Sequence, residues 1–167
     1  GKRFPGMDHP DYQKLLVLNE TLGGYFGSRL MRNIREDKGY TYGIYSAISP
    51  KENDCVFYIG TDVNYAVTDN TIAEVLKEVK QLQQEEIPAD ELETVKNYML
   101  GKFLNDISTI FDQCDRYKRI VLYQLSPEHY NNFVTTIRTV TAPELLALAN
   151  TYYKEDELYT VVAGRRG

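Results

Sequence analysis

The chain has 167 residues, 43% hydrophobic and 26% charged, which is enough for one globular domain with a sizeable core. The formal net charge is -5, and this argues against general nucleic-acid binding because a phosphate backbone attracts a basic surface. No uninterrupted apolar run could span a bilayer, so no membrane partner is expected. We expect a single domain over residues 1–167 that is a fragment of a longer protein, because the chain opens abruptly with "GKRFPG".

Two helices are predicted in the first 39 residues. Leucines near helical spacing in "DHPDYQKLLVLNETLGG" predict the first helix, with Asp8 as its N-cap and the glycine pair as its end. The following "GGYFG" is a flexible elbow, since glycine adopts backbone angles that other residues avoid. A short second helix is predicted from Ser28 to Gly39.

A β-hairpin is predicted next, because the pattern changes to a period of two at Tyr40. Tyr40, Tyr42 and Ile44 would share one face of the first strand. The turn "SPKEND" and the apolar "CVFYIGTDV" predict an antiparallel partner strand.

The rest of the chain reads mainly as helices. An amphipathic helix is predicted over 70–85, and "IPADELE" begins another that breaks near 105–108. Two further helices begin at "SPE" and "TAPE", where a cap residue precedes proline and glutamate. The final "ELYTVVAG" is typical of a buried strand. This order predicts an α+β fold with a mostly antiparallel sheet covered by helices. Three strands form a thin sheet, which suggests a missing segment upstream of Gly1.

A metal site inside this chain is not expected. A hydrolytic zinc site needs histidines at set spacings beside a glutamate, and the chain has two histidines in all. His9 has no partner, and Leu125 stands where an HxxEH motif ending at His129 needs its first histidine. We expect His129 to be an exposed residue of a first helical turn. Cys55 and Cys114 lie far apart and are predicted to be buried free thiols.

Other catalytic motifs do not occur in the sequence. It contains no GxSxG, GxxxxGK[ST] or GxGxxG pattern. The glycine-rich "GGYFGSR" could hold an anion at a helix N-terminus, but we interpret it as a structural elbow. We therefore predict that this chain alone is inactive as an enzyme.

The stretch "RLMRNIREDKGYTYGIYSAIS" places three arginines ahead of a Tyr-x-Tyr strand. Two interpretations are open. Arg35 could simply favour the helix C-terminus electrostatically, while Tyr42 in its strand packs against the sheet's helices. Alternatively, this is a polar site that binds a peptide, with Arg29, Arg32 and Tyr40 structural or at its rim.

The segment "LGGYFGSRLMRNIREDKGYTYGIYS", residues 22–46, resembles the second, non-zinc domain of the M16 (insulinase, pitrilysin-like) zinc peptidases. The Gly-Gly elbow, SRL and R-E-x-x-G-x-x-Y carry the resemblance, which continues into "PADELETVKNYMLGKF". It implies one half domain of the kind found in LuxS and the mitochondrial processing peptidase. It also implies that the first strand of this half, normally just before "GKRFPG", is missing.

The resemblance further implies a function shared between two domains. In the family, a first domain carries HxxEH and a distal glutamate that bind zinc, while the second contributes an arginine and a tyrosine to the substrate. Those positions match Arg35 and Tyr42. The expected function is the substrate-binding C-terminal domain of a zinc-dependent metallopeptidase that hydrolyses peptides, with zinc on a partner domain or subunit. The alternatives are a non-catalytic M16-like subunit, a peptide-binding scaffold or a plain interaction domain.

The expected partners are a peptide substrate and the zinc-bearing N-terminal domain or subunit. A homodimer through the sheet edge exposed by the missing strand is a further hypothesis. The sequence leaves the compartment open between bacterial periplasm and cytoplasm.

Overall fold

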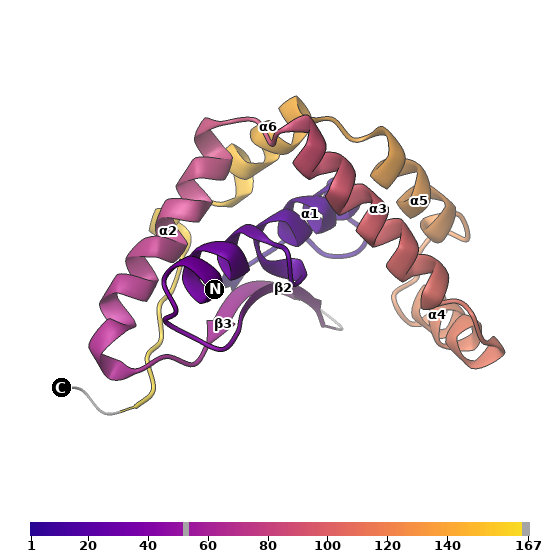
Figure 1. Ribbon diagram of the computed structural model, residues 1–167. Helices are drawn as coiled ribbons and strands as arrows, with labels where there is room; N and C mark the ends of the chain where they lie inside the picture. The colour runs from indigo at the N-terminus through magenta and orange to yellow at the C-terminus, as the bar shows by residue number, and fades with distance from the viewer. Residues whose placement is uncertain (52–53, 165–167) are drawn as a thin grey trace.

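A three-stranded antiparallel sheet with helices above it forms the fold in the computed structural model, which describes residues 1–51 and 54–164 (Figure 1). The strands are β1 Lys2–Arg3, β2 Ile44–Pro50 and β3 Cys55–Thr61, in the spatial order β1-β3-β2. The predicted α+β class with an antiparallel sheet is confirmed. Within the described ranges, no helix combines the length and apolar character needed to cross a bilayer.

The two strands of the predicted hairpin are confirmed, but the first begins later than expected and continues to Pro50. Residues 52–53 of the predicted turn lie outside the described residues. β2 pairs with β3 from Ile44 opposite Thr61 to Pro50 opposite Cys55. Residues 40–43 form a loop instead of a strand. Thr41 fixes this loop, because its hydroxyl bonds within the loop to Gly43 and also donates to the carbonyl of Asp62, beyond the end of β3, at 2.8 Å. Glycines at both ends of this segment favour such a turn over an extended ladder.

Two outcomes differ from prediction at the other edge of the sheet. β1 was not predicted, because a strand of two residues carries no periodic pattern. Conversely, the buried strand predicted in "ELYTVVAG" is wrong: Leu158–Gly164 belongs to no strand, and Val161 is 90% exposed. Beyond Gly1, which hydrogen-bonds to Tyr159, the described chain offers this segment no neighbouring strand.

The helices follow the predicted order. They are α1 Tyr12–Asn19, α2 Thr68–Gln84, α3 Ala89–Asn105, α4 Ile110–Leu122, α5 His129–Thr139 and α6 Ala142–Tyr152, with π-helical turns η1 Glu20–Gly24 and η2 Met31–Asp37 and 3-10 turns η3 Tyr65–Val67 and η4 Glu155–Glu157. The predicted break near 105–108 and the cap at Thr141 are confirmed. Helix α1 begins after Asp11 instead of Asp8, because residues 7–11 form a turn in which the His9 amide donates to the Gly6 carbonyl.

The core lies between α1 and the sheet, with α2 and α6 on one side of α1 and α3 and α5 on the other (Figure 1). Leu15, Val17 and Leu18 of α1 are fully buried. The rings of Phe57 and Tyr153 stack at 4.9 Å between centroids and join the C-terminal end of α6 to the sheet. Helix α4 projects away from this core, and none of its residues is buried within the described chain.

Candidate functional site

The two predicted site residues line one open hollow of about 790 Å³ beside the β2–β3 hairpin. We call it the hairpin hollow; its lining residues are Arg35, Glu36, Gly39, Tyr40, Thr41, Tyr42, Asp62, Val63 and Asn64. One side comes from the end of η2 and the loop that follows, and the other from the chain just beyond β3. The fold thus brings Arg35 and Tyr42 together with a segment some twenty residues further along the chain.

Arg35 lies in the last turn of η2, and the elbow residue Phe26 supports its guanidinium. The guanidinium carbon lies 4.6 Å from the centre of the Phe26 ring, a cation–π geometry. Among the described residues its nearest carboxylate is Glu36, at 3.9 Å, and the side chain is 34% exposed. Arg35 is therefore held by an aromatic face while its N–H donors are not committed to a close ion pair. Phe26 was not singled out from the sequence.

Tyr42 lies at the tip of the loop between η2 and β2, with a fully exposed side chain. Gly39 ends η2 in the left-handed region at φ +65°, and the hydrogen bonds of Thr41 fix the loop to the end of β3. The exposure contradicts the interpretation in which Tyr42 packs against the sheet's helices. Tyr40 takes the packing role instead, since it contacts the core and its amide donates to the Ile34 carbonyl.

The other two arginines bind a protein carboxylate. The guanidinium of Arg29 donates to both oxygens of Glu91 at 2.9 and 2.8 Å, and Arg32 donates to the same carboxylate at 3.0 Å. Arg29 and Glu91 are mostly buried, so this bidentate pair links the segment entering η2 to the first turn of α3. The three clustered arginines therefore have different roles. Arg29 and Arg32 attach this segment to α3 through Glu91, and Arg35 lines the hairpin hollow.

Asn33 is a further positioning residue that sequence reasoning missed. It is buried, and its amide donates to Glu74 at 2.9 Å and to Glu78 at 2.6 Å, both on α2. The amide hydrogen bond, with Lys38 and Lys77 nearby, lowers the pKa of the Glu74 carboxyl. The sequence signal that could have identified Asn33 is a polar residue on the inward face of a predicted helix. Asn33 fixes the helical turn that carries Arg35 against α2.

The glycine elbow is explained by close packing. A side chain on Gly23 would place its Cβ 2.6 Å from the Ser46 backbone nitrogen, so η1 lies directly on β2. Buried Asn19 and Ser46 reinforce this contact, since the Asn19 amide donates to the Ser46 carbonyl at 3.3 Å. The elbow therefore sets the position of η2 and the hairpin hollow relative to the sheet.

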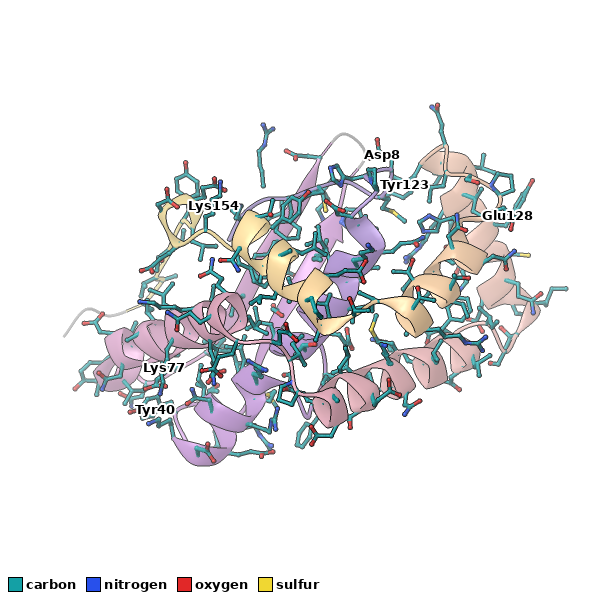
Figure 2. All side chains as sticks on the ribbon, turned by 90° about the horizontal axis from the view of Figure 1, so that it is seen from above. Asp8, Tyr40, Lys77, Tyr123, Glu128 and Lys154 are labelled. Atoms are coloured by element: carbon teal, nitrogen blue, oxygen red, sulfur yellow. The ribbon has the colours of Figure 1, made fainter. Side chains whose placement is uncertain are left out.

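The described residues do not fit a zinc ion. Within 1–51 and 54–164, no group of three His, Cys, Asp or Glu side chains is placed to hold a metal. His129 is half-buried instead of exposed as predicted, because it begins α5 against Tyr130, and burial lowers its pKa. Figure 2 shows Glu128 and Tyr40 at opposite ends of the molecule, so the Glu128–His129 pair is remote from the hairpin hollow. Cys55 is buried as predicted, whereas Cys114 is exposed because α4 projects from the core.

Comparison with known proteins gives consistent results. Residues 1–99 match the family described as the peptidase M16 inactive domain. A Bacillus subtilis protein named uncharacterized zinc protease YmxG is 27% identical over 165 residues, covering 96% of this chain and 40% of the relative. A Helicobacter pylori protein named non-peptidase homolog YmxG is 33% identical over 93 residues, covering 54% of this chain and 21% of the relative.

Solved structures share the fold. The peptidase M16 inactive domain from Pseudomonas fluorescens superposes with a TM-score of 0.83 at 25% identity, over 91% of this chain and 36% of that one. A protease from Helicobacter pylori gives a TM-score of 0.81 at 18% identity, over 93% and 38%.

The fold and the sequence match define an inactive peptidase domain, and its described residues hold no metal-binding group. The chain belongs to the peptidase M16 family, as its inactive C-terminal domain, and this confirms the resemblance found in the sequence. It spans about 40% of the length of the Bacillus subtilis relative.

Proposed function

We propose that this chain is the substrate-binding C-terminal domain of a zinc-dependent metallopeptidase that hydrolyses peptides, with zinc held by a partner domain outside the chain. The observation that carries the proposal is the hairpin hollow. Arg35 and Tyr42 both line it, the phenol is fully exposed, and the guanidinium is held by an aromatic ring with its donors available. These are the two positions at which the family resemblance implies substrate contact.

The chemistry of the pair suits a peptide. A guanidinium presents a planar fork of N–H donors, which matches the carbonyl oxygens of an extended peptide backbone. A phenol hydroxyl donates one hydrogen bond, and it stabilises a carbonyl oxygen best when that oxygen gains negative charge. In this proposal Arg35 orients the peptide, and Tyr42 donates to the oxygen of the bond that is cleaved on the partner domain.

The test of the site is Tyr42→Phe in the parent enzyme, because it removes a single hydroxyl from an exposed side chain. We expect kcat to fall on the order of 100-fold with little change in KM, as for loss of one donor to a developing oxyanion. The free energy of unfolding should not change, since Tyr42 packs against nothing in the described chain.

Tyr45→Phe is the matched control for this substitution. Tyr45 lies on β2, is half exposed and packs edge-on against Tyr58, outside the hairpin hollow. Its variant should retain the parent kcat. Retention of full kcat by Tyr42→Phe as well would remove Tyr42 from the proposed role.

A second candidate is a non-catalytic M16-like subunit or scaffold that binds peptides without cleaving them. It is favoured by one observation: the relative named non-peptidase homolog is 33% identical over 93 residues. In that case the hairpin hollow binds a peptide, and no part of the same polypeptide hydrolyses it. A parent protein that binds unfolded peptides in titration, but neither contains zinc nor cleaves them, supports this candidate over the first.

A further inference from the structure

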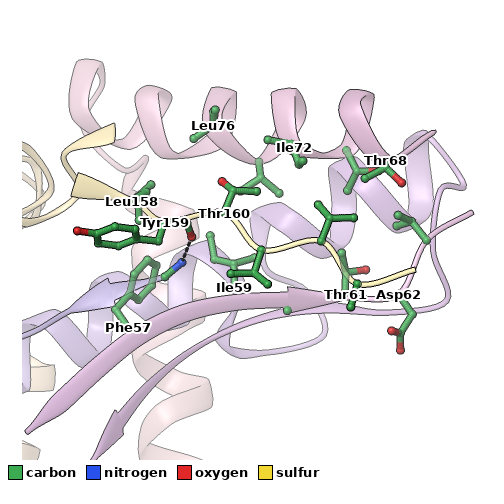
Figure 3. A pocket seen from close by; sticks show the side chains of 18 residues that line it. Phe57, Ile59, Thr61, Asp62, Thr68, Ile72, Leu76, Leu158, Tyr159 and Thr160 are labelled. Carbon is green, nitrogen blue, oxygen red and sulfur yellow. Dashed lines mark hydrogen bonds between the residues drawn. The ribbon is translucent and has the colours of Figure 1, made fainter. Parts of the chain in front are cut away.

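A cavity of about 310 Å³ lies at the end of the molecule where α4 and α5 meet the end of α3 (Figure 1). We call it the helix cavity; α1, the first residue of η1 and the end of β2 add further walls. Its lining residue His129 directly follows Glu128, which Figure 2 places at the opposite end of the molecule from Tyr40. The hollow between β3 and residues 158–163, which Figure 3 shows, shares no lining residue with it. The helix cavity is therefore separate from both other hollows.

One side of the helix cavity is apolar. Leu16 of α1 and Phe133 of α5 line it and pack against the core, and Met99 of α3 is buried. The ring of Phe103 lies 5.4 Å from that of Phe133, measured between centroids, and extends the same wall. Burial of apolar surface against such a wall favours a ligand with an apolar side chain.

Arg116 forms the α4 side of the cavity, and its guanidinium is already bound. The guanidinium carbon lies 4.8 Å from the centre of the Phe103 ring and 5.1 Å from that of Tyr130, while one nitrogen donates to the Asp106 carboxylate at 3.4 Å. Cation–π contacts and an ion pair thus attach α4 to α3 and α5. Arg116 therefore shapes the cavity, and its charge is not available to a ligand.

Three other charged side chains line the cavity and form no ion pair within 4 Å inside the described ranges. They are Glu20, Lys102 and Arg119. The Oε1 atom of Glu20 is buried and accepts no hydrogen bond from a described residue. Burial raises the pKa of the Glu20 carboxyl, and the nearby charge of Lys102 opposes this rise. A buried carboxylate oxygen without a donor is unfavourable, so a cationic donor entering the cavity would be stabilised there.

The charges are arranged from the inside outward. Glu20 is half-buried, whereas Lys102 and Arg119 are exposed and so lie at the open side of the cavity. An α-amino acid carries its ammonium and carboxylate groups on one carbon atom. Its head group can therefore bond to a carboxylate and to a cation that do not reach each other. The volume is at the lower end of the roughly 300–1,000 Å³ typical of small-molecule sites, which fits a single amino acid better than a longer peptide.

We propose that the helix cavity binds a free apolar amino acid. Glu20 accepts from its ammonium group, Lys102 and Arg119 donate to its carboxylate, and its side chain packs on the apolar wall of Leu16 and Phe133. A free amino acid contains no peptide bond, so this binding is distinct from the proposed hydrolysis at the hairpin hollow.

Phenylalanine and two analogues test the proposal by calorimetric titration of the parent protein. Phenylpropionate lacks the ammonium group of phenylalanine, and phenethylamine lacks its carboxylate. We expect each analogue to bind about tenfold or more weakly than phenylalanine, because each loses hydrogen bonds to charged groups. Glycine should also bind more weakly, since it has no side chain for the apolar wall. Phenylalanine should raise the thermal midpoint of the parent protein as it binds the folded state.

Two charge-removing variants of the parent protein assign the groups. Glu20→Gln should weaken phenylalanine binding about tenfold or more and leave phenylpropionate binding nearly unchanged, because it removes the acceptor of the ammonium group. Lys102→Met should weaken both of these ligands and leave phenethylamine binding nearly unchanged. Glu86→Gln and Lys80→Met are the matched controls, since both residues are exposed and lie outside the helix cavity. Glu20→Gln should fold normally, because an amide is easier to bury than an unpaired carboxylate.

Three results would overturn the proposal. One is the absence of phenylalanine binding to the folded parent protein. Another is equal affinity for phenylalanine and either analogue, since one charged group would then suffice. The last is full phenylalanine affinity in Glu20→Gln. A parent protein that fails to hydrolyse peptides would leave these binding results unchanged, so the two proposals fail separately.

Discussion

Two adjacent tyrosines at the end of α6 have opposite surroundings. The Tyr152 hydroxyl donates to the Asp11 carboxylate at 2.7 Å. Tyr153 is almost fully buried, and its hydroxyl has no hydrogen-bond partner among the described residues. A buried polar group without a partner destabilises the folded state, whereas a satisfied one stabilises it modestly. The hydroxyl groups of these two neighbouring tyrosines therefore contribute to stability with opposite signs.

We expect Tyr153→Phe to raise the free energy of unfolding by about 1 kcal/mol, and Tyr152→Phe to lower it by about 1 kcal/mol. Chemical denaturation of the two variants measures this difference directly, and each serves as the control for the other. If Tyr153→Phe were the more destabilising variant, the Tyr153 hydroxyl would have a partner that stabilises the fold.

The capping box of α6 introduces a pH dependence. The Glu144 carboxylate accepts from Lys14 at 2.6 Å and from the amide and hydroxyl of Thr141, each at 2.9 Å. These hydrogen bonds, Lys14 first, lower the pKa of Glu144 from 4.5 to about 2. A carboxyl whose pKa is lowered on folding contributes stability above its unfolded pKa, and this contribution is lost as the pH falls from 4.5 toward 2.

Glu144→Ala should therefore lower the free energy of unfolding by about 1 kcal/mol at pH 7, because the cap and the ion pair are lost. The loss is no larger because solvent screens the partly exposed ion pair. At pH 2 the difference between the variant and the parent should shrink toward zero. Unfolding titrations at pH 7, 4 and 2 follow the change. If the difference in the free energy of unfolding between parent and variant were the same at all three pH values, the carboxylate charge would contribute nothing to stability.

At the scale of elements, the contact between η1 and β2 sets the geometry of the site. The Gly23 backbone lies so close to Ser46 that a methyl group cannot fit, whereas a Cβ on Gly101 in α3 meets no atom within 4 Å. Gly23→Ala should lower the free energy of unfolding by about 2 kcal/mol through overpacking. Gly101→Ala should raise it by about 0.5–1 kcal/mol, since alanine favours a helix interior.

Thermal unfolding of the two alanine variants checks this prediction. A tolerated Gly23→Ala would show that η1 can move away from β2 without loss of stability. The elbow would then not fix the position of η2.

Elements defined by local signals were predictable. The apolar stripe of α2 and the Thr141–Glu144 capping box depend on residues three or four apart, and both appear where expected. Strand assignments depended on distant partners and failed more often. The hydrogen bond from Thr41 to Asp62 holds the segment around Tyr40 in a loop instead of in β2. Leu158–Gly164 has no partner strand in the described chain beyond its contact with Gly1. Helix α4 was predicted. Its separation from the core, which exposes Cys114, was not predicted.

The substrate-binding roles of Arg35 and Tyr42 stay predictions, and the shape of the hollow that these residues line could not be predicted from the sequence. Arg35 and Tyr42 stood out by their spacing in a family motif, not by any chemistry visible in one sequence. The hairpin hollow also needs Asp62 and Asn64 from beyond β3, and only the folded hairpin brings them to Tyr42. The support of Arg35 by Phe26 likewise depends on the folded elbow.

For the whole molecule, the domain offers hydrogen-bond donors at its surface but no metal-binding group within its described residues. The central proposal therefore places hydrolysis on a partner that bears zinc, with this domain binding the peptide. The homodimer through the sheet edge stays a prediction. β3 pairs with β2 along its length and with β1 at Val56 and Phe57, and residues 158–163 line a hollow beside Ile59 and Thr61 of β3.

The most direct test of the central claim is to measure zinc content and peptide hydrolysis on the purified parent protein, before and after chelation. The proposal predicts about one zinc per parent protein, in one chain or in the zinc-bearing subunit. It also predicts hydrolysis of an unfolded peptide that chelation abolishes and zinc restores, and that Tyr42→Phe impairs without loss of the metal. A parent protein without zinc that binds but never cleaves peptides would contradict it and identify a non-catalytic homologue.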